Sequence, residues 1–352
     1  MQALLTTPGR VHSARVEPID YPSPPPDGVS IRTVEVGVCG TDREITEGLY
    51  GQPPAGERDL VLGHEFLGEV IEDAGGFTAG DLVTATVRRS CGHCAACDQA
   101  SPDACATGDY TERGIMALHG FASELVVERP EHLVAVPASL GRLGVLAEPA
   151  SICVRGTRHA LTIGQRQVWT PKRALVIGAG AIGMLATYLL RLADFEVWTA
   201  ARGDAQTEKG RLATESGAEY VSTRETPLPD LAEAVGGFNL VVEASGNADV
   251  MLQVLALLGR NGVGCLLGLD SHPRPLSIDS TVIGVDAVLE NRALFGSVNA
   301  HRSDWTGAVD QLVAIHDRWP DALDTMIGLR VAPDRFQEAF AYRGVKATLQ
   351  FT

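Results

Sequence analysis

The sequence predicts a mixed α/β protein in which a β-rich part is followed by a doubly wound parallel sheet. Two observations carry this prediction. Alternating apolar segments such as VSIRTVEVGV (29–38), punctuated by glycine and proline, read as strands in the N-terminal part. Farther along, strands and helices alternate, as in ALVIG (174–178), AIGMLATYLLRLA (181–193) and FEVWTAA (195–201). Such alternation is typical of βαβ units and of a parallel sheet.

Other segments extend the two patterns. The β-rich part contains further strand-like stretches at 60–72, 81–87, 121–128 and 133–137. The alternating part begins with a helix-like stretch at 146–161 and continues through a helix at 208–217, a strand at 239–245, a helix at 249–259 and a strand at 262–269. The tail adds a helix at 305–318 and a strand-like end at 345–352. We therefore expect two domains in the 352 residues.

Composition limits the classes of function. The formal net charge of −15 argues against a nucleic-acid partner, which would need a basic surface. The N-terminal stretch 1–13 lacks the charged region and apolar core of a signal peptide. The longest apolar run, 174–190, is too short and too rich in glycine to be read as a membrane span. We expect a cytoplasmic protein with no membrane partner, whose seven cysteines are reduced.

A glycine-rich turn lies between the strand at 174–178 and the helix that follows. It consists of Gly178, Ala179, Gly180, Ala181, Ile182 and Gly183. In this context the glycines permit a tight turn, close approach of a pyrophosphate and packing of the helix on the sheet, and the helix N-terminus attracts the phosphates. A turn without a ligand is the alternative. The motif predicts a dinucleotide-binding domain of the Rossmann type.

The end of the next strand indicates which dinucleotide binds. NAD sites usually carry an acidic residue here for the ribose hydroxyls, but this chain has Ala200 and Ala201, followed by Arg202. Because an arginine pairs well with a 2′-phosphate, the sequence favours NADP, with NAD possible. The alternative is that Arg202 is an ordinary solvated residue, and the nearby Asp204 weakens the case for a phosphate.

Four cysteines, Cys91, Cys94, Cys97 and Cys105, lie within one short stretch. Four thiolates at such spacings in a reducing compartment predict a closed, structural zinc site. An iron–sulfur cluster is the alternative, since three cysteines at this spacing also resemble a ferredoxin motif. His93 could replace one thiolate.

A second metal site would need an open position for chemistry. The candidates are Cys39, His64 with Glu65, and Glu148, because zinc with one thiolate, one imidazole and one carboxylate keeps a free corner. These residues are far apart in the sequence. The alternatives are an ordinary buried thiol and a hydrogen-bonded core histidine.

The order of these motifs resembles that of the zinc-dependent medium-chain dehydrogenases over essentially the whole chain, and most of all the glucose 1-dehydrogenases. The stretches that carry the closer resemblance are 87–89, 112–115, 119–121, 196–202 and 296–300. The resemblance implies a GroES-like catalytic domain, residues 1–155 completed by 300–352, and an NADP-binding Rossmann domain, residues 156–299. It also implies two zinc ions per chain and a homodimer or homotetramer.

The resemblance also implies roles for single residues. Cys39, His64 and Glu148 would hold the catalytic zinc, with Glu65 as a ligand or an exchanging near-ligand. Thr41 would lie beside the reacting oxygen. Substrate contacts would come from Thr41, Glu112, Glu148 and Asn299. Cofactor contacts beyond the glycine-rich turn would come from Ala201, Arg202, Gly268, Ser297, Val298, Asn299 and Lys346.

The expected reaction is transfer of a hydride from a sugar hydroxyl, C1 of glucose or a related pyranose, to NADP, giving a lactone. Three departures from the family pattern leave the substrate open. Gly203 follows Arg202 where a second arginine is frequent, Val87 stands where relatives can have asparagine, and Ile152 stands where some have an acid. The alternatives are a polyol or simple alcohol, a modified sugar or cyclitol, and a non-catalytic NADP-binding redox sensor. Asp42 is expected to cap a turn or orient a neighbour.

Overall fold

The computed structural model describes residues 1–20, 27–272 and 274–351 and divides into two compact units. The first unit comprises Met1–Ser151, Asn299–Val313 and Ile327–Thr352, and the second comprises Ile152–Val298 and Ala314–Met326. The predicted mixed α/β class is confirmed. The boundary between the two units lies after residue 151, a few residues before the expected boundary after residue 155. Residues 314–326 belong to the second unit, although they were expected in the catalytic domain.

The first unit is built on a seven-stranded sheet. Its order is β11-β6-β5-β3-β19-β18, and β10 also pairs with β3. These strands are β3 (Val29–Val38), β5 (Glu65–Val70), β6 (Leu82–Ala85), β10 (Leu125–Glu128), β11 (Leu133–Val136), β18 (Ile327–Val331) and β19 (Lys346–Gln350). The C-terminal β19 pairs antiparallel with β3, with Ala347 opposite Val38. The tail therefore completes the sheet that the N-terminal part begins.

Two smaller sheets and several short helices complete the first unit. The sheets have the orders β2-β1-β4 and β7-β8-β9. Their strands are β1 (Gln2–Thr6), β2 (Arg15–Pro18), β4 (Leu60–Val61), β7 (Arg88–Arg89), β8 (Thr111–Arg113) and β9 (Ala117–Leu118). The helices are α1 (Gly40–Thr46), α2 (Ala95–Asp98), α11 (Phe336–Ala341) and the single turns η1 (Pro102–Ala104), η2 (Pro130–His132), η3 (Gly141–Leu146) and η5 (Pro333–Arg335).

The strand expected at 60–72 is interrupted at Gly63. This residue has a φ of +89°, and a Cβ there would lie 2.7 Å from Val36 Cγ1 and 3.1 Å from the Ala122 nitrogen. Because only glycine fits this backbone and this space, the chain turns between β4 and β5. The interruption places His64 and Glu65 at the start of β5.

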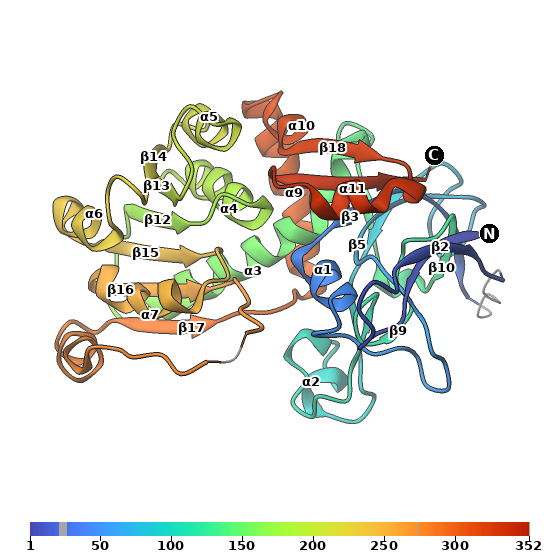
Figure 1. Cartoon of the computed structure of the whole chain (residues 1–352), viewed down its shortest axis with the longest axis horizontal. Helices are drawn as coiled ribbons and strands as arrows, with labels where there is room; N and C mark the ends of the chain where they lie inside the picture. The colour runs from blue at the N-terminus through green and yellow to red at the C-terminus, as the bar shows by residue number, and fades with distance from the viewer. Residues whose placement is uncertain (21–26, 273, 352) are drawn as a thin grey trace. The chain divides into compact units, whose positions relative to one another are not determined.

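The second unit contains a parallel six-stranded sheet with the order β14-β13-β12-β15-β16-β17. The strands are β12 (Arg173–Ile177), β13 (Glu196–Ala201), β14 (Glu219–Ser222), β15 (Phe238–Glu243), β16 (Leu258–Leu266) and β17 (Ala293–Gly296). Within this unit, α4 and α5 lie on one side of the sheet and α7 on the other (Figure 1). Reversal of strand order at β12 produces this arrangement, so the predicted doubly wound sheet is confirmed.

The remaining helices connect the strands, and those at 147–164 and 302–318 each begin in the first unit and end in the second. They are α3 (Ala147–Gly164), α4 (Ala181–Leu192), α5 (Glu208–Glu215), α6 (Leu228–Val235), α7 (Ala248–Leu257), the π-helical turn η4 (Val282–Asp286), α8 (Ala287–Leu289), α9 (Arg302–Arg318) and α10 (Ala322–Met326). The core of the second unit joins Leu175 and Ile177 of β12 to Phe238 and Val241 of β15. Among the described residues, no helix is long and apolar enough to cross a membrane.

The glycine-rich turn connects β12 to α4, as the sequence predicts. Gly178 has a φ of +111°. A Cβ on Gly183 would lie only 1.8 Å from the carbonyl oxygen of Gly178, whereas a Cβ on Gly180 would meet nothing within 4 Å. Gly183 is therefore required by the packing of the turn itself, and Gly180 is not.

This difference predicts that Gly183→Ala destabilises the protein and Gly180→Ala does not. The added methyl in Gly183→Ala must push α4 away from the strand, at a cost of about 1–3 kcal/mol in the free energy of unfolding. Chemical denaturation of both variants, followed by circular dichroism, measures the effect. Equal stability of the two variants would contradict the structure of the turn.

Candidate active site

Three predicted metal ligands converge in the first unit. Cys39 directly precedes α1, and His64 and Glu65 lie where β5 begins. One ligand atom from each of these side chains lies within 4.8 Å of the other two. His64 and Glu65 are almost completely buried, and Cys39 is half-buried. A thiol, an imidazole and a carboxylate at such distances fit a zinc ion that keeps a position open for a ligand.

Neighbouring strands bring these residues together. In the sheet, Gly37 lies opposite Glu65 and Val38 lies opposite Ala347, so the end of β3 meets the starts of β5 and β19. Lys346 Nζ lies 2.6 Å from both carboxylate oxygens of Glu65 and also donates to the Val38 carbonyl at 3.2 Å. Burial alone would lower the pKa of Lys346. The negative charge of Glu65 opposes this effect, and the pKa of Lys346 is raised overall. Lys346 is thus a buried ammonium group.

Asp42 supports two members of this group. Its Oδ2 accepts the Cys39 backbone N–H at 2.8 Å, and its Oδ1 lies 3.5 Å from Nδ1 of His64. Burial alone would raise the pKa of Asp42. The interaction with His64 opposes this effect, so the pKa of Asp42 is lowered overall and its carboxylate stays charged. A carboxylate behind a histidine fixes the ring and leaves its other nitrogen for a metal. This geometry agrees with the expected role of Asp42 in a turn and in orienting a neighbour.

Glu148 and Thr41 lie close to the group without being part of its tight cluster. Thr41 Oγ1 is 3.9 Å from the Cys39 sulfur. Glu148, in the first turn of α3, is buried but stands outside the set of ligand atoms that lie within 4.8 Å of one another. Burial raises the pKa of Glu148 to about 7; His64 opposes the rise, and Glu65 adds to it. Its role as a zinc ligand stays a prediction.

The two residues expected to hold a sugar meet in the first unit. Asn299 Nδ2 donates to Glu112 Oε1 at 2.9 Å, and both side chains are buried. Arg88 Nε donates to the same oxygen at 3.0 Å. Arg88 lies in the stretch 87–89 that carries the family resemblance, but the sequence assigns no role to it. Only its place one strand away, opposite Glu112 in the β7–β8 pair, reveals the contact.

The four cysteines gather as the sequence predicts. One sulfur from each of Cys91, Cys94, Cys97 and Cys105 lies within 4.8 Å of the others, and the Cys91 N–H points to the Cys97 sulfur at 3.4 Å. A hydrogen bond with Thr107 lowers the pKa of the Cys105 thiol to about 6. The set fits a closed tetrahedral metal site.

His93 does not join the cysteine cluster. Its Nδ1 lies 2.7 Å from the Cys91 carbonyl oxygen, and its Nε2 lies 3.2 Å from Asp109. The exposed ring thus pairs with the loop backbone and an exposed carboxylate, which leaves four sulfurs as the donor set.

Most predicted cofactor residues lie in the second unit, after the carboxyl ends of parallel strands. The glycine-rich turn follows β12, Arg202 follows β13, Gly268 follows β16, and Ser297 and Val298 follow β17. In doubly wound sheets this edge is where nucleotides bind. Arg202 is exposed, and the turn after it is held by hydrogen bonds from Tyr220 and Thr207 to backbone carbonyls. Asn299 and Lys346, in the first unit, are held by Glu112 and Glu65, and their cofactor contacts stay predictions.

A buried carboxylate that was not predicted from the sequence also lies at this edge. Glu243, the last residue of β15, accepts the Ser245 N–H at 2.7 Å, and its Oε2 lies 2.7 Å from where a Cβ on Gly268 would be. Glu243 thus shapes the turn after β15, and the backbone of Gly246 together with the Glu243 side chain leaves no room for a Cβ at residue 268. An acidic residue at the end of an apolar run, NLVVEAS, is the signal that could have revealed it.

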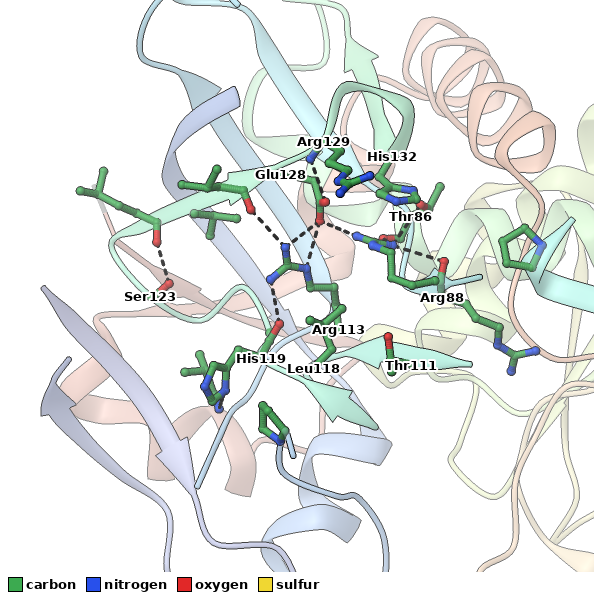
Figure 2. A pocket seen from close by; sticks show the side chains of 18 of the residues that line it. Thr86, Arg88, Thr111, Arg113, Leu118, His119, Ser123, Glu128, Arg129 and His132 are labelled. Atoms are coloured by element: carbon green, nitrogen blue, oxygen red, sulfur yellow. Dashed lines mark hydrogen bonds and ion pairs between the residues drawn. The ribbon is translucent and has the colours of Figure 1, made fainter. Parts of the chain in front are cut away.

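A cavity of about 1350 Å³ in the first unit is lined by none of the candidate catalytic metal ligands, although Cys97 of the cysteine cluster and Arg88 both line it. In its wall, Arg89 and Arg113 both bind Glu128, and Arg113 also donates to the carbonyls of His119 and Val127 (Figure 2). Burial, with Arg89, lowers the pKa of the adjacent His132 to about 4. Arg89, Arg113 and Glu128 are thus bonded to one another.

Comparison with known proteins agrees with this geometry. The model of the alcohol dehydrogenase GroES-like domain matches residues 25–138, and the model of the glucose dehydrogenase C-terminus matches residues 141–351. Glucose 1-dehydrogenase of Methanocella arvoryzae is 43% identical over 343 residues, which cover 96% of this chain and 95% of that protein. Glucose 1-dehydrogenase 1 of Caldivirga maquilingensis is 38% identical over 348 residues, or 97% and 96% of the two chains.

A solved structure shows the same likeness. The glucose dehydrogenase of Haloferax mediterranei, described in complex with NADP, Zn and gluconolactone, matches with a TM-score of 0.92 at 31% identity, covering 100% of this chain and 99% of that one. Both halves of the chain and its metal-ligand clusters thus lead to one assignment: the chain belongs to the zinc-dependent medium-chain dehydrogenases and, within them, to the glucose dehydrogenase branch.

Proposed function

We propose that this dehydrogenase oxidises the C1 hydroxyl of an aldopyranose, glucose or a close relative, to a lactone and passes the hydride to NADP. The observation that carries the proposal is the convergence of Cys39, His64 and Glu65 on one point of the first unit. The buried pair of Glu112 and Asn299 in the same unit supports a polyhydroxylated substrate. The relatives named glucose 1-dehydrogenase and the NADP, Zn and gluconolactone of the Haloferax structure support the substrate and the cofactor.

Metal binding, proton transfer and substrate binding fall to different residues of the chain. Zinc held by Cys39, His64 and a carboxylate supplies Lewis-acid polarisation of the substrate hydroxyl. The departing proton leaves to solvent through the Thr41 hydroxyl, which lies near the Cys39 sulfur, through Glu65 or through a bound water. Glu112 and Asn299 bind the other hydroxyls and fix the ring, because buried polar groups reject substrates that leave them unpaired.

We propose two zinc ions per chain, the second in the cysteine cluster with a structural role. The chemistry of four adjacent thiols supports this ion, and the lowered pKa of Cys105 favours a thiolate. A four-thiolate site requires reduced cysteines, which supports a location in the cytoplasm.

Cys39→Ser tests the catalytic site. Turnover should fall by about two orders of magnitude or more, because the substitution removes a metal ligand. Reduced-cofactor absorbance is measured with glucose, galactose, xylose, sorbitol and ethanol, each with NADP and NAD. Metal analysis should find about two zinc ions in the wild type and one fewer in the variant.

Cys153→Ser is the matched control. Cys153 is also buried, but its thiol bonds to the Ile182 carbonyl, which a serine hydroxyl can replace. This variant should keep both activity and zinc, and both variants should bind NADP. Full activity of Cys39→Ser would overturn the proposal. One zinc in the wild type and no turnover of any substrate would favour a redox sensor instead.

Arg202→Ala tests the choice of NADP. Loss of the guanidinium should raise the KM for NADP about tenfold or more and leave the KM for NAD nearly unchanged, because only NADP carries the 2′-phosphate. Gly180→Ala should instead weaken both cofactors, since its methyl occupies the space assigned to the pyrophosphate. A loss that is equal for NADP and NAD in Arg202→Ala would contradict the assignment.

We also propose that the chain forms homodimers, which a second interface could extend to tetramers. Strand β17 is the edge of the second unit's sheet. Large apolar side chains on and around it are exposed: Leu269, Ile283, Val285, Val288, Leu289, Leu294 and Val298. An open edge surrounded by apolar residues is suited to pairing with a second copy.

Sedimentation of the wild type should therefore give at least twice the mass of the 37.3 kDa chain. Leu294→Lys, on β17, should shift the protein towards the single chain, because the charge loses water in a paired edge. Val11→Lys, at an exposed apolar residue of the first unit, should leave the mass unchanged. A wild type that sediments as a single chain at micromolar concentration would exclude this interface.

A further inference from the structure

We propose that Arg88 is a positioning residue that links the cysteine loop, residues 91–105, to Glu112 and thereby makes sugar affinity depend on the metal in that loop. The inference rests on the proposed function, in which Glu112 binds a sugar hydroxyl. It adds a residue outside the predicted sites and a working role for a cluster that the sequence analysis treated as scaffold.

The contacts of Arg88 carry the inference. Its Nε donates to Glu112 Oε1 at 3.0 Å, and its Nη1 donates to the carbonyl oxygen of Asp103 at 3.1 Å. The guanidinium carbon lies 3.7 Å from the centre of the Tyr110 ring. The Arg88 and Glu112 side chains are each about 6% exposed. One planar, buried group thus touches both the loop and the predicted substrate carboxylate.

The loop end of this link depends on the cysteines. Asp103 lies in the single turn η1, between Cys97 and Cys105 and two residues from the latter. Such a short turn has too few backbone hydrogen bonds to hold its own position. In a loop of this kind the metal supplies the folding free energy, so the place of the Asp103 carbonyl depends on metal occupancy.

The substrate end of the link is tightly constrained. Arg88 and Glu112 are paired residues of β7 and β8, so their backbones are fixed against each other. Glu112 Oε1 accepts from both Arg88 and Asn299, which leaves Oε2 as the oxygen that we assign to the sugar. Because the guanidinium fork is rigid, losing its anchor at Asp103 lets the carboxylate rotate out of register.

The neighbouring arginine on the same strand provides a matched comparison. Arg89 is also largely buried and also pairs with a carboxylate, but it binds Glu128 and the Thr86 carbonyl. Both arginines line the same cavity, but Arg89 pairs with Glu128 and Arg88 pairs with Glu112. Loss of stability from removing a buried arginine of β7 should therefore appear when either Arg88 or Arg89 is replaced. A change in sugar affinity should appear only when Arg88 is replaced.

The first test compares Arg88→Met and Arg88→Lys with Arg89→Met. Both Arg88 variants should raise the KM for glucose about tenfold or more, with kcat and the KM for NADP nearly unchanged, because they lose a charged hydrogen-bonding fork. Arg89→Met should lower the melting temperature without changing the KM for glucose. An unchanged KM for glucose in the Arg88 variants, or an equal rise in Arg89→Met, overturns the proposal.

The second test breaks the loop with Cys105→Ser, which should remove one zinc per chain. In the wild-type background this change should raise the KM for glucose, and in the Arg88→Met background it should add little, because the link is already cut. If Cys105→Ser raises the KM for glucose by the same factor in both backgrounds, the proposal is overturned. If Cys105→Ser does not fold, the Arg88 and Arg89 variants still decide the question.

A third measurement needs no sugar turnover. Hydrogen–deuterium exchange of residues 110–113 should be faster in Cys105→Ser than in the wild type and equally fast in Arg88→Met with and without that change. Unchanged exchange in Cys105→Ser overturns the link. Coupled exchange in a protein that turns over no sugar would retain the link and reject the proposed function, so the two failures can be told apart.

Discussion

The active site is organised around the buried ion pair between Glu65 and Lys346. The two residues start strands β5 and β19, which flank β3, and the carboxylate of Glu65 occupies the space above Gly37, where a Cβ would lie 2.0 Å from its Oε2. Removing either charge would leave the other buried and unpaired, which is strongly unfavourable. Residues from the N-terminal part and the C-terminal tail are thus held together at the point where Cys39 leaves β3.

From this constraint follows the geometry of the metal ligands. Because β3 ends where β5 and β19 begin, Cys39 has little freedom to move away from His64 and Glu65. The turn at Gly63 places His64 in the interior. Asp42 accepts the Cys39 backbone N–H and also lies against the His64 ring. The site is therefore a consequence of strand register, and a metal ion would enter an arrangement that the sheet already holds.

The sequence could predict features whose cause is local. The bounds of β3 match the prediction, and the turn at Gly183 could be recognised because its requirement for glycine comes from five residues upstream. Strands β14 and β17 were missed because each has only four residues. Helix α6 was missed because prolines at 227 and 229 lie at its start, where they read as a turn. Cysteine spacing alone predicted the four-thiolate site, whereas the catalytic ligands were assigned roles from family resemblance. Arg88 could not be predicted, since its contacts depend on the pairing of β7 with β8.

The charge balance of the site gives an independent reason to expect a cation there. Three acidic side chains, of Asp42, Glu65 and Glu148, are buried close together. Lys346 forms an ion pair with Glu65. Asp42 lies beside His64 and, against the lowering effect of burial, raises the pKa of that imidazole well above its usual value. His64 opposes the rise in the pKa of Glu148, yet burial still holds that pKa at about 7. A divalent ion would add positive charge beside Glu148, lower the pKa of Glu148 and release its proton. Metal binding and ionisation of Glu148 are therefore two aspects of the same electrostatic balance.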